Sequence, residues 1–267
     1  MASKNTAALQ REMFDAVVKG MARRRGLGAP VRDAFFRHEL SDGVSHYPMA
    51  RLLSSRNGAA GGGRGGKTRL ALYLSLIWIA SGSDHSSDRP ASFWAALRGL
   101  PDPDHAGSRV VRSTWRELEA RGLVAVDPAP VAGEPPSVKL LREDGSGAPY
   151  TIPDGTPGET YRRIPEAAWR FLFADAGLTG AGLAMYLVVI RTAGRAGQLT
   201  DLAIARTYFQ TEYGLGESTR KNGLRNLVDL GVLDARRRRT DDFGDPSRRG
   251  RLRYTYDLLD IYAPVKR

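Results

Sequence analysis

Cysteine is absent from the 267 residues, which excludes disulfide bonds and thiolate metal sites and is typical of a reducing compartment. Long apolar runs are absent too. The longest, LALYLSLIWIA, is too short to cross a bilayer, and the N-terminus lacks the apolar block of a secretory signal. We therefore expect a cytoplasmic protein with no membrane partner.

Catalytic signatures are equally scarce. The four histidines are scattered along the chain, which contains neither an H-E-x-x-H zinc motif nor a G-x-S-x-G nucleophile motif. His85 with Asp84 and Asp88 is the grouping best suited to a metal ion, and it looks like a solvated loop. We expect a non-enzymatic protein with no catalytic residue, no cofactor and no metal site.

One motif points toward an enzyme. GGGRGGKTRL, residues 61–70, places Gly61, Gly66, Lys67 and Thr68 in the G-x-x-x-x-G-K-[ST] pattern of a phosphate-binding loop. Such a loop follows a buried strand, whereas the preceding ARLLSSRNGAA is polar and the neighbouring elements are helical. A P-loop NTPase therefore stays an alternative, and we expect the glycine run to be a flexible approach to a helix.

Acidic residues are outnumbered: 40 Lys and Arg stand against 29 Asp and Glu, giving a net charge of +11. The excess is concentrated in residues 1–70 and 220–267, around a mildly acidic middle. A compositional preference for arginine would spread the charge evenly. The two basic ends therefore favour an anionic partner, most often nucleic acid.

The sequence contains an internal repeat. LALYLSLI (70–77) resembles LAMYLVVI (183–190), and GSRVVRSTWRELEARGLVAV from Gly107 resembles GESTRKNGLRNLVDLGVLDA from Gly216. The two pairs occur in the same order, each offset by about 110 residues. This pattern indicates a duplicated domain.

Each copy is expected to contain three helices followed by a β-hairpin, in an α+β fold that is mostly helical. The first copy's helices are expected at 67–82, ASFWAALRGL and RVVRSTWRELEARG, and the second copy's at 178–194, TDLAIARTYFQTEYG and STRKNGLRNLVDLG. Thr200 is a candidate N-cap. The third helices end at Gly122 and Gly231, which suit the left-handed conformation.

The hairpin strands are expected after these glycines. The first copy offers LVAVD and SVKLLR, with APYTI as a further strand, and the second offers VLDARRRR and RLRYTYDL. In RLRYTYDL, apolar and aromatic residues alternate with polar ones. This period of two predicts one buried face, made of Leu252, Tyr254, Tyr256 and Leu258.

STRKNGLRNLVDLGVLDARRRR and RGRLRYTYDL look like the recognition helix and wing of winged-helix DNA-binding proteins. From about residue 65 to the end, the chain resembles tandem winged-helix proteins, including plasmid replication initiators and actinobacterial helix-turn-helix proteins. We divide it into an N-terminal basic arm (1–45), a first winged-helix domain (46–160) and a second (161–267).

The third helix of such a domain enters the major groove. In the second copy, Leu224, Leu227 and Val228 form the expected buried stripe. The outward face, which we expect to contact DNA, then consists of Ser218, Thr219, Lys221, Asn222 and Arg225. Asparagine can read adenine and arginine guanine bidentately, and Ser218 is expected to cap the helix.

The second wing is the most basic part of the chain. Eight arginines lie on this hairpin, one of them Arg253. We expect contacts with DNA phosphates or the minor groove from the other seven, Arg236, Arg237, Arg238, Arg239, Arg248, Arg249 and Arg251. Because strand side chains alternate between faces, not all of them can touch DNA. Neutralisation within the chain by Asp241, Asp242 and Asp245 is the alternative.

The first copy is less basic. Its candidate DNA contacts lie along one helix face, at Arg109, Arg112 and Arg116. The opposite face is expected to form core, with Val110, Val111, Trp115 and Leu118. This copy binds DNA weakly or serves as a dimerisation or partner module.

The N-terminal segment contains Leu9, Met13, Val17 and Met21 at a spacing of four, which predicts an amphipathic helix leading into KGMARRRG. We expect this helix to pack on the first copy or to contact a partner. A DNA-binding arm is the second interpretation and a membrane-surface helix the third.

These observations predict a protein that binds double-stranded DNA sequence-specifically in the nucleoid or on a plasmid, as a transcriptional regulator. Plasmid replication initiation or partition is the alternative role. A P-loop NTPase and a protein–protein adaptor are alternatives of other classes, and homodimerisation stays open.

Overall fold

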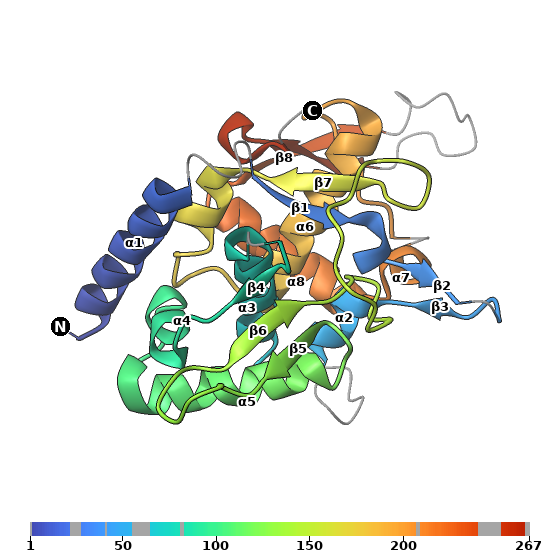
Figure 1. Cartoon of the computed structure of the whole chain (residues 1–267). Coiled ribbons are helices and arrows are strands. Elements are labelled where there is room, and N and C mark those ends of the chain that lie inside the picture. The colour runs from blue at the N-terminus through green and yellow to red at the C-terminus, as the bar shows by residue number, and fades with distance from the viewer. Residues whose placement is uncertain are drawn as a thin grey trace.

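The computed structural model describes residues 2–21, 28–40, 42–54, 65–80, 83–206, 209–239 and 252–264. The fold is α+β, with more helix than strand and with small antiparallel sheets (Figure 1). The helices are α1 (Ala2–Met21), α2 (Pro48–Leu53), α3 (Gly66–Ile79), α4 (Ala91–Leu97), α5 (Ser108–Glu119), α6 (Gly180–Ala196), α7 (Phe209–Tyr213) and α8 (Glu217–Asp229). The strands are β1 (Ala29–Arg32), β2 (His38–Glu39), β3 (Ser45–His46), β4 (Ser86–Ser87), β5 (Val124–Asp127), β6 (Ser137–Leu140), β7 (Tyr161–Ile164), β8 (Leu233–Arg239) and β9 (Leu252–Leu258).

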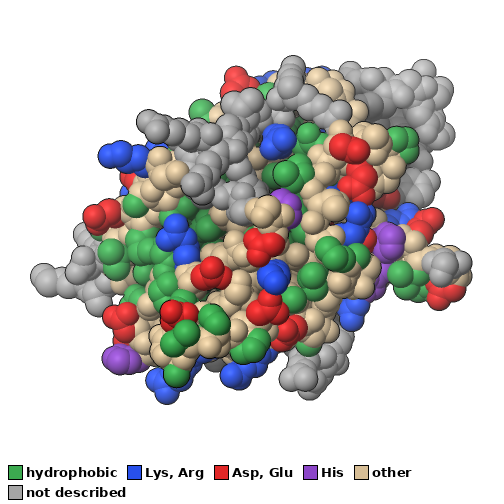
Figure 2. Space-filling view, in the orientation of Figure 1, with side chains coloured by type: hydrophobic (Ala, Val, Ile, Leu, Met, Phe, Trp, Pro, Cys, Tyr) green, Lys and Arg blue, Asp and Glu red, His purple; other side chains and the backbone are tan. Residues whose placement is uncertain are grey.

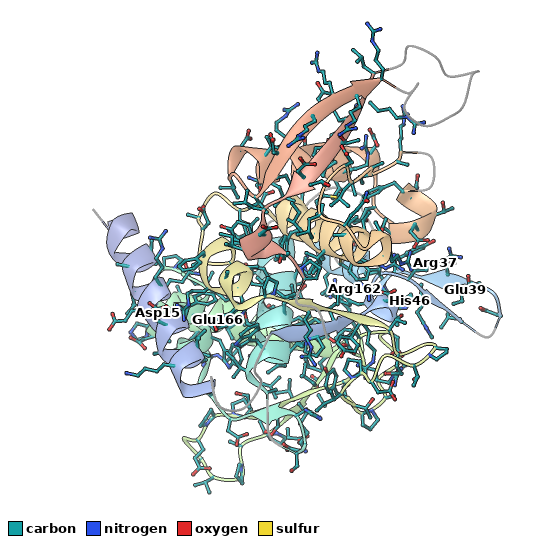
Figure 3. All side chains as sticks on the ribbon, turned by 90° about the horizontal axis from the view of Figure 1, so that it is seen from above. Asp15, Arg37, Glu39, His46, Arg162 and Glu166 are labelled. Carbon is teal, nitrogen blue, oxygen red and sulfur yellow. The ribbon has the colours of Figure 1, made fainter. Side chains whose placement is uncertain are left out.

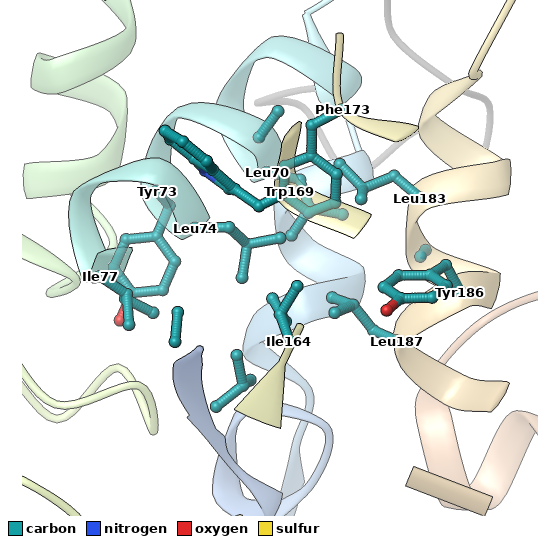
Figure 4. Packing of buried hydrophobic residues seen from close by; sticks show 14 of the residues in the cluster. Leu70, Tyr73, Leu74, Ile77, Ile164, Trp169, Phe173, Leu183, Tyr186 and Leu187 are labelled. Carbon is teal, nitrogen blue, oxygen red and sulfur yellow. The ribbon is translucent and has the colours of Figure 1, made fainter. Parts of the chain in front are cut away.

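Two apolar helices form the centre of the molecule. LALYLSLI lies in α3 and LAMYLVVI in α6, and both stretches are buried along their whole length. A helix that is apolar on all sides is stable only when it is surrounded. The two helices pack against each other, and Ile164 and Trp169 belong to the same cluster (Figure 4). One apolar core therefore runs through both copies of the repeat.

The two copies share one order of elements. In the first copy α3 is followed by β4, α4, α5, β5 and β6, and the sheet order is β4-β6-β5. In the second copy α6 is followed by an isolated bridge at Leu202, then α7, α8, β8 and β9. Leu202 pairs with Tyr256 on β9. In both copies, therefore, the extended segment after the first helix lies beside the last strand of the hairpin.

A pair of buried tyrosines occupies equivalent positions in α3 and α6. Tyr73 and Tyr186 are both fully buried. The Tyr73 hydroxyl donates to the carbonyl of Leu141, just after β6, over 3.5 Å. The Tyr186 hydroxyl donates to the carbonyl of Tyr262, after β9, over 2.9 Å. Each copy thus ties its first helix to the chain that leaves its hairpin.

Left-handed backbone conformations recur in the same places. Gly122 after α5 and Gly231 after α8 have φ of 67° and 66°, which confirms the predicted helix ends. His85 and Asp201 have φ of 52° and 55°, and each immediately precedes the extended segment of its copy. Because this conformation is uncommon in residues other than glycine, its recurrence supports the duplication.

Two element predictions were wrong. TDLAIARTYFQTEYG is not one helix: residues 199–206 form turns and a bridge, Thr200 caps no helix, and the described helix begins at Phe209. The left-handed backbone of Asp201 and the Leu202 bridge are incompatible with a helix there. APYTI contributes only a bridge at Pro149, since proline has no N–H to continue a ladder.

The N-terminal helix packs on α4 of the first copy, as predicted, and also on the turn at residues 168–172, which the proposed division places in the second domain. Its Phe14 ring meets Trp169 edge-on at 4.2 Å, Gln10 donates to the Leu97 carbonyl at the end of α4, and Asp15 pairs with Arg170. In Figure 3, Asp15 on α1 lies beside the turn that carries Glu166. The predicted apolar face is partly wrong, because Leu9 is 44% exposed.

The segment after α1 links the two copies. Strand β1 pairs antiparallel with β7, from Ala29 opposite Ile164 to Arg32 opposite Tyr161. The proposed boundary between the domains, at residue 160, therefore lies directly before a strand that pairs with the N-terminal segment. Residues 22–27, which hold most of the basic KGMARRRG run, lie outside the described residues.

Candidate nucleic-acid interface

Helix α8 presents the predicted outward face. Ser218, Lys221, Asn222 and Arg225 are exposed, and Thr219 is half-buried. The opposite side is buried through Gly223, Leu224 and Leu227, and Val228 is partly buried against the same core. The spacing of apolar residues thus predicted the orientation of this helix correctly.

The start of α8 differs from the prediction. Gly216, in an extended conformation, precedes the first helical residue, so Ser218 lies inside the first turn and does not cap the helix. Glu217 occupies the first turn, where a carboxylate is favoured by the helix dipole. Arg220 donates to the Glu217 carboxylate from Nε and from Nη2, each over 2.8 Å, and the pKa of Glu217 is lowered mainly by this hydrogen bonding.

Arg220 is a site residue that sequence reasoning missed. Besides holding Glu217, it donates to the carbonyl of Ile204 over 3.1 Å. It therefore fixes the 203–206 segment beside α8. The Glu-x-x-Arg spacing of Glu217 and Arg220 is the signal that could have identified the ion pair.

The arginine run on β8 divides between the two faces of the hairpin. Arg236 pairs with Asp257 at 2.7 Å, and Arg238 pairs with Asp201 at 2.6 Å. On the other face, Arg237 lies over the Tyr254 ring and donates to its hydroxyl over 2.9 Å, and Arg239 is exposed. Two of the four charges are therefore neutralised by described carboxylates, whereas strand alternation places Arg237 and Arg239 on the opposite face, where Arg237 contacts Tyr254.

The acidic partners found among the described residues are other than the three named from the sequence, which the structure does not test. Arg236 and Arg238 are held by Asp257, Asp201 and, at 3.7 Å, Asp234. The predicted partners Asp241, Asp242 and Asp245 lie outside the described residues, as do Arg248, Arg249 and Arg251. Arg253 is half-buried on β9.

The burial pattern of β9 is only partly the predicted one. Leu258 is buried and Tyr256 half-buried, but Leu252 and Tyr254 are 62% and 51% exposed. Thr255, on the face predicted to be exposed, is fully buried. The physical reason is that the hairpin extends away from the core, as the pale red strands in Figure 3 show, so that its outer half lies beyond the described apolar cluster.

A groove of about 570 Å³ separates α8 from the wing. Its apolar lining includes Ile204, Leu224 and Val228, and the wing contributes Tyr254 and Tyr256. The cations of the groove are Arg206, Arg220, Lys221, Arg225 and Arg253. No Asp or Glu occurs among the described residues that line it. The groove therefore favours an anionic molecule.

In the first copy, Arg109, Arg112 and Arg116 are exposed on α5 as predicted. Of the four residues predicted to be core, Val111, Trp115 and Leu118 are buried, and Val110 is wrong, since it lies off this helical stripe and is 44% exposed. On the adjacent hairpin, Lys139 is neutralised by Asp127 at 2.7 Å. Acidic and basic side chains are interspersed over the face that carries β5 and β6 (Figure 2). This copy offers a weaker positive field.

The P-loop-like motif does not present its lysine to a ligand. Lys67 points toward the loop before α6, where its Nζ approaches the Asp175 carbonyl at 3.4 Å. Burial, and secondarily Arg98, lowers the pKa of Lys67 to about 8. Before the motif, residues 48–53 form helix α2 and residues 55–64 lie outside the described part. The described geometry thus lacks the strand and the free lysine of a phosphate-binding loop.

Within the described residues, no three His, Asp or Glu side chains gather into a group that could hold a metal ion, and this includes the region of His85. No helix in these segments is long and apolar enough to span a bilayer.

Comparison of the chain with protein-family models, with curated proteins and with solved structures finds no match in any of the three.

Proposed function

We propose that this protein binds double-stranded DNA sequence-specifically through two winged-helix units, of which the second is the main reader. The observation that carries the proposal is the groove-side surface of the second unit. There Lys221, Arg225, Arg237 and Arg239 project from α8 and the wing, while the carboxylates nearby are already engaged by other arginines. Such a surface needs an anionic partner.

The arrangement suits a duplex. An exposed helix face of polar and basic side chains fits the major groove, where Asn222 and Arg225 can read base edges. A hairpin beside it reaches the adjacent backbone or minor groove. Three helices and a hairpin in each copy, with a third extended segment beside the last strand, are the elements of a winged helix.

We propose transcriptional regulation in the cytoplasm as the role. Two reading units on one chain suit repeated or asymmetric sites and also favour plasmid replication initiation. The exposed row of Arg109, Arg112 and Arg116 gives the first unit a weaker DNA contact or a partner contact. Footprinting on the DNA that the protein binds would separate an operator from a replication origin.

The test is duplex binding over a salt series, with DNA flanking the protein's own gene against scrambled DNA. Two matched double variants each remove the arginines of one face of the wing. One is Arg237→Ala with Arg239→Ala, and the other is Arg236→Ala with Arg238→Ala. The first pair is expected to weaken binding and to lower the salt slope by about 1.8, since each lost phosphate contact contributes about 0.9. The second pair should lower the slope much less, because its charges are already paired.

Equal effects of the two pairs would mean that the wing meets DNA in another orientation. Absence of binding at about 50 mM salt, where a few phosphate contacts suffice for detection, would overturn the DNA proposal. ATP binding and protein partners would then be the questions to address.

A further inference from the structure

We propose that the groove between α8 and the wing receives an unpaired nucleotide of a DNA strand, with its base on Tyr254 and its phosphates at Lys221 and Arg225. The inference rests on the proposed DNA binding and goes beyond it. A fully paired duplex does not require such a groove, so the two proposals fail under different results.

The first observation is the apolar lining. Ile204, Leu224 and Val228 face the groove, and Ala203, Ala205 and Ala235 complete this surface. A duplex presents mainly phosphates and sugars to a surface like this, and its base faces are stacked out of reach. An unpaired base exposes its flat apolar faces. It can therefore cover the apolar lining that a duplex would leave in contact with water.

The second observation is the state of Tyr254. Its ring is 51% exposed and lines the groove, while its hydroxyl accepts a hydrogen bond from Arg237. The Arg237 guanidinium lies 5.2 Å from the ring centroid. The side chain is thus held before any ligand arrives. A fixed, accessible aromatic ring flanked by cations is the combination that stacks bases of single strands.

The third observation is charge and size. Lys221 and Arg225 are exposed at the groove, and the Lys221 ammonium lies 3.8 Å from Glu217, whose carboxylate Arg220 already holds. The Lys221 ion pair is thus long and shares a carboxylate that Arg220 holds more tightly, and no described residue pairs with Arg225, so both cations can meet phosphate. The volume of about 570 Å³ lies within the range of about 300–1,000 Å³ that pockets for small organic molecules occupy. A nucleotide fits this combination of flat apolar body and negative charge.

The experiment measures dissociation constants by fluorescence anisotropy for two DNAs of identical sequence, one fully paired and one with a short internal single-stranded gap. The variants are Tyr254→Ala, Tyr254→Phe and the control Phe171→Ala. Phe171 is an aromatic residue that is also 51% exposed, and it lies on the turn after β7, outside the groove. The readout is the ratio of the two affinities, so that general effects on folding or duplex binding cancel.

Wild type is expected to prefer the gapped DNA about tenfold, the size of one base–aromatic stack. Tyr254→Ala should abolish the preference, whereas Tyr254→Phe and Phe171→Ala should keep it. Equal binding of the two DNAs by wild type, or a preference that survives Tyr254→Ala, would overturn the inference and leave duplex binding in place. Failure of the wild type to bind either DNA would overturn the proposed function itself.

A competition arm separates the two sources of a nucleotide. Free thymidine monophosphate is added to the complex with gapped DNA. Failure to displace the DNA at concentrations far above those of the strand is expected if the groove holds a nucleotide within a strand. Displacement at concentrations comparable to those of the DNA would mean that the groove takes free nucleotides, against the proposal.

Discussion

Asp201 and Arg238 form an ion pair of 2.6 Å that joins the loop before α7 to the wing. The backbone N–H of Asp201 also donates to the Asp257 carboxylate over 2.8 Å, and the Thr255 hydroxyl donates to Asp201 over 3.4 Å. With φ of 55°, Asp201 holds these bonds from a left-handed conformation. The base of the wing is therefore organised around a residue with an uncommon backbone.

Substitutions of Asp201 should separate charge from backbone. Asp201→Asn keeps a side chain that tolerates the left-handed conformation, so it should lower the free energy of unfolding by less than about 1 kcal/mol, the usual value of a partly exposed ion pair. Asp201→Val adds backbone strain and should cost about 1–3 kcal/mol more. Urea denaturation measures both. Equal losses for the two variants would show that the backbone conformation carries no cost.

Gly223 lies where α8 crosses α6. A Cβ at this position would stand 2.4 Å from the Ala181 carbonyl oxygen and 2.4 Å from the Met185 side chain. Gly223→Ala should therefore push the helices apart and lower the free energy of unfolding by about 1–3 kcal/mol, although alanine favours helix. The control is Gly20→Ala in α1, where a Cβ meets nothing within 4 Å. Thermal unfolding should show a lower midpoint for Gly223→Ala alone.

The equivalent tyrosines of the two copies offer a second matched pair. Tyr186→Phe removes a buried hydrogen bond of 2.9 Å and should cost about 0.5–1.5 kcal/mol. Tyr73→Phe removes a bond of 3.5 Å, at the limit of hydrogen bonding, and should cost less. Chemical denaturation of both variants gives the comparison. A larger loss for Tyr73→Phe would contradict the assignment.

Glu143 predicts a dependence of stability on pH. Burial raises its pKa to about 7, although the neighbouring Arg32 guanidinium opposes this. Between about pH 4.5 and 7 the folded protein therefore keeps a proton that the unfolded chain releases. Raising the pH through this window should lower the free energy of unfolding, by up to roughly 3 kcal/mol from this group.

The control for this prediction is Glu143→Gln, which cannot titrate. Asp144 and Glu159, whose pKa values are lowered in the folded protein, act in the opposite sense, and they are present in both proteins. The wild type should therefore lose stability relative to the variant as the pH rises from 4.5 to 7. Parallel curves over that window would contradict the raised pKa.

Sequence periodicity identified the helices and hairpins whose formation depends on residues close together in the sequence. The apolar stretches of α3 and α6, the helix ends at Gly122 and Gly231, and the two hairpins follow from residue spacing and turn chemistry. Strand β1 could not be identified in this way, because APVR becomes a strand only by pairing with residues more than a hundred positions away. Pairing at such a distance leaves no periodic signal within four residues.

The sequence predicted which residues form the candidate site better than it predicted their ion pairs and their exposure. The apolar stripe of α8 predicted which of its residues are exposed. The alternation of side chains along β8 predicted that its arginines point to both faces of the hairpin. Which face would be neutralised depended on Asp201, which lies more than thirty positions before the run. The exposure of Tyr254 likewise depended on how far the hairpin extends past the core. These are tertiary properties that no window of sequence contains.

The mutual burial of α3 and α6 has a consequence for how this chain can change over time. The buried residues of the two copies form one cluster, so we expect the copies to unfold together and not to be exchangeable as separate modules. A substitution that weakens the first copy is expected to lower the folded fraction of the second copy as well. Selection for binding by one copy is therefore expected to limit core substitutions in both copies, even where their surface residues differ.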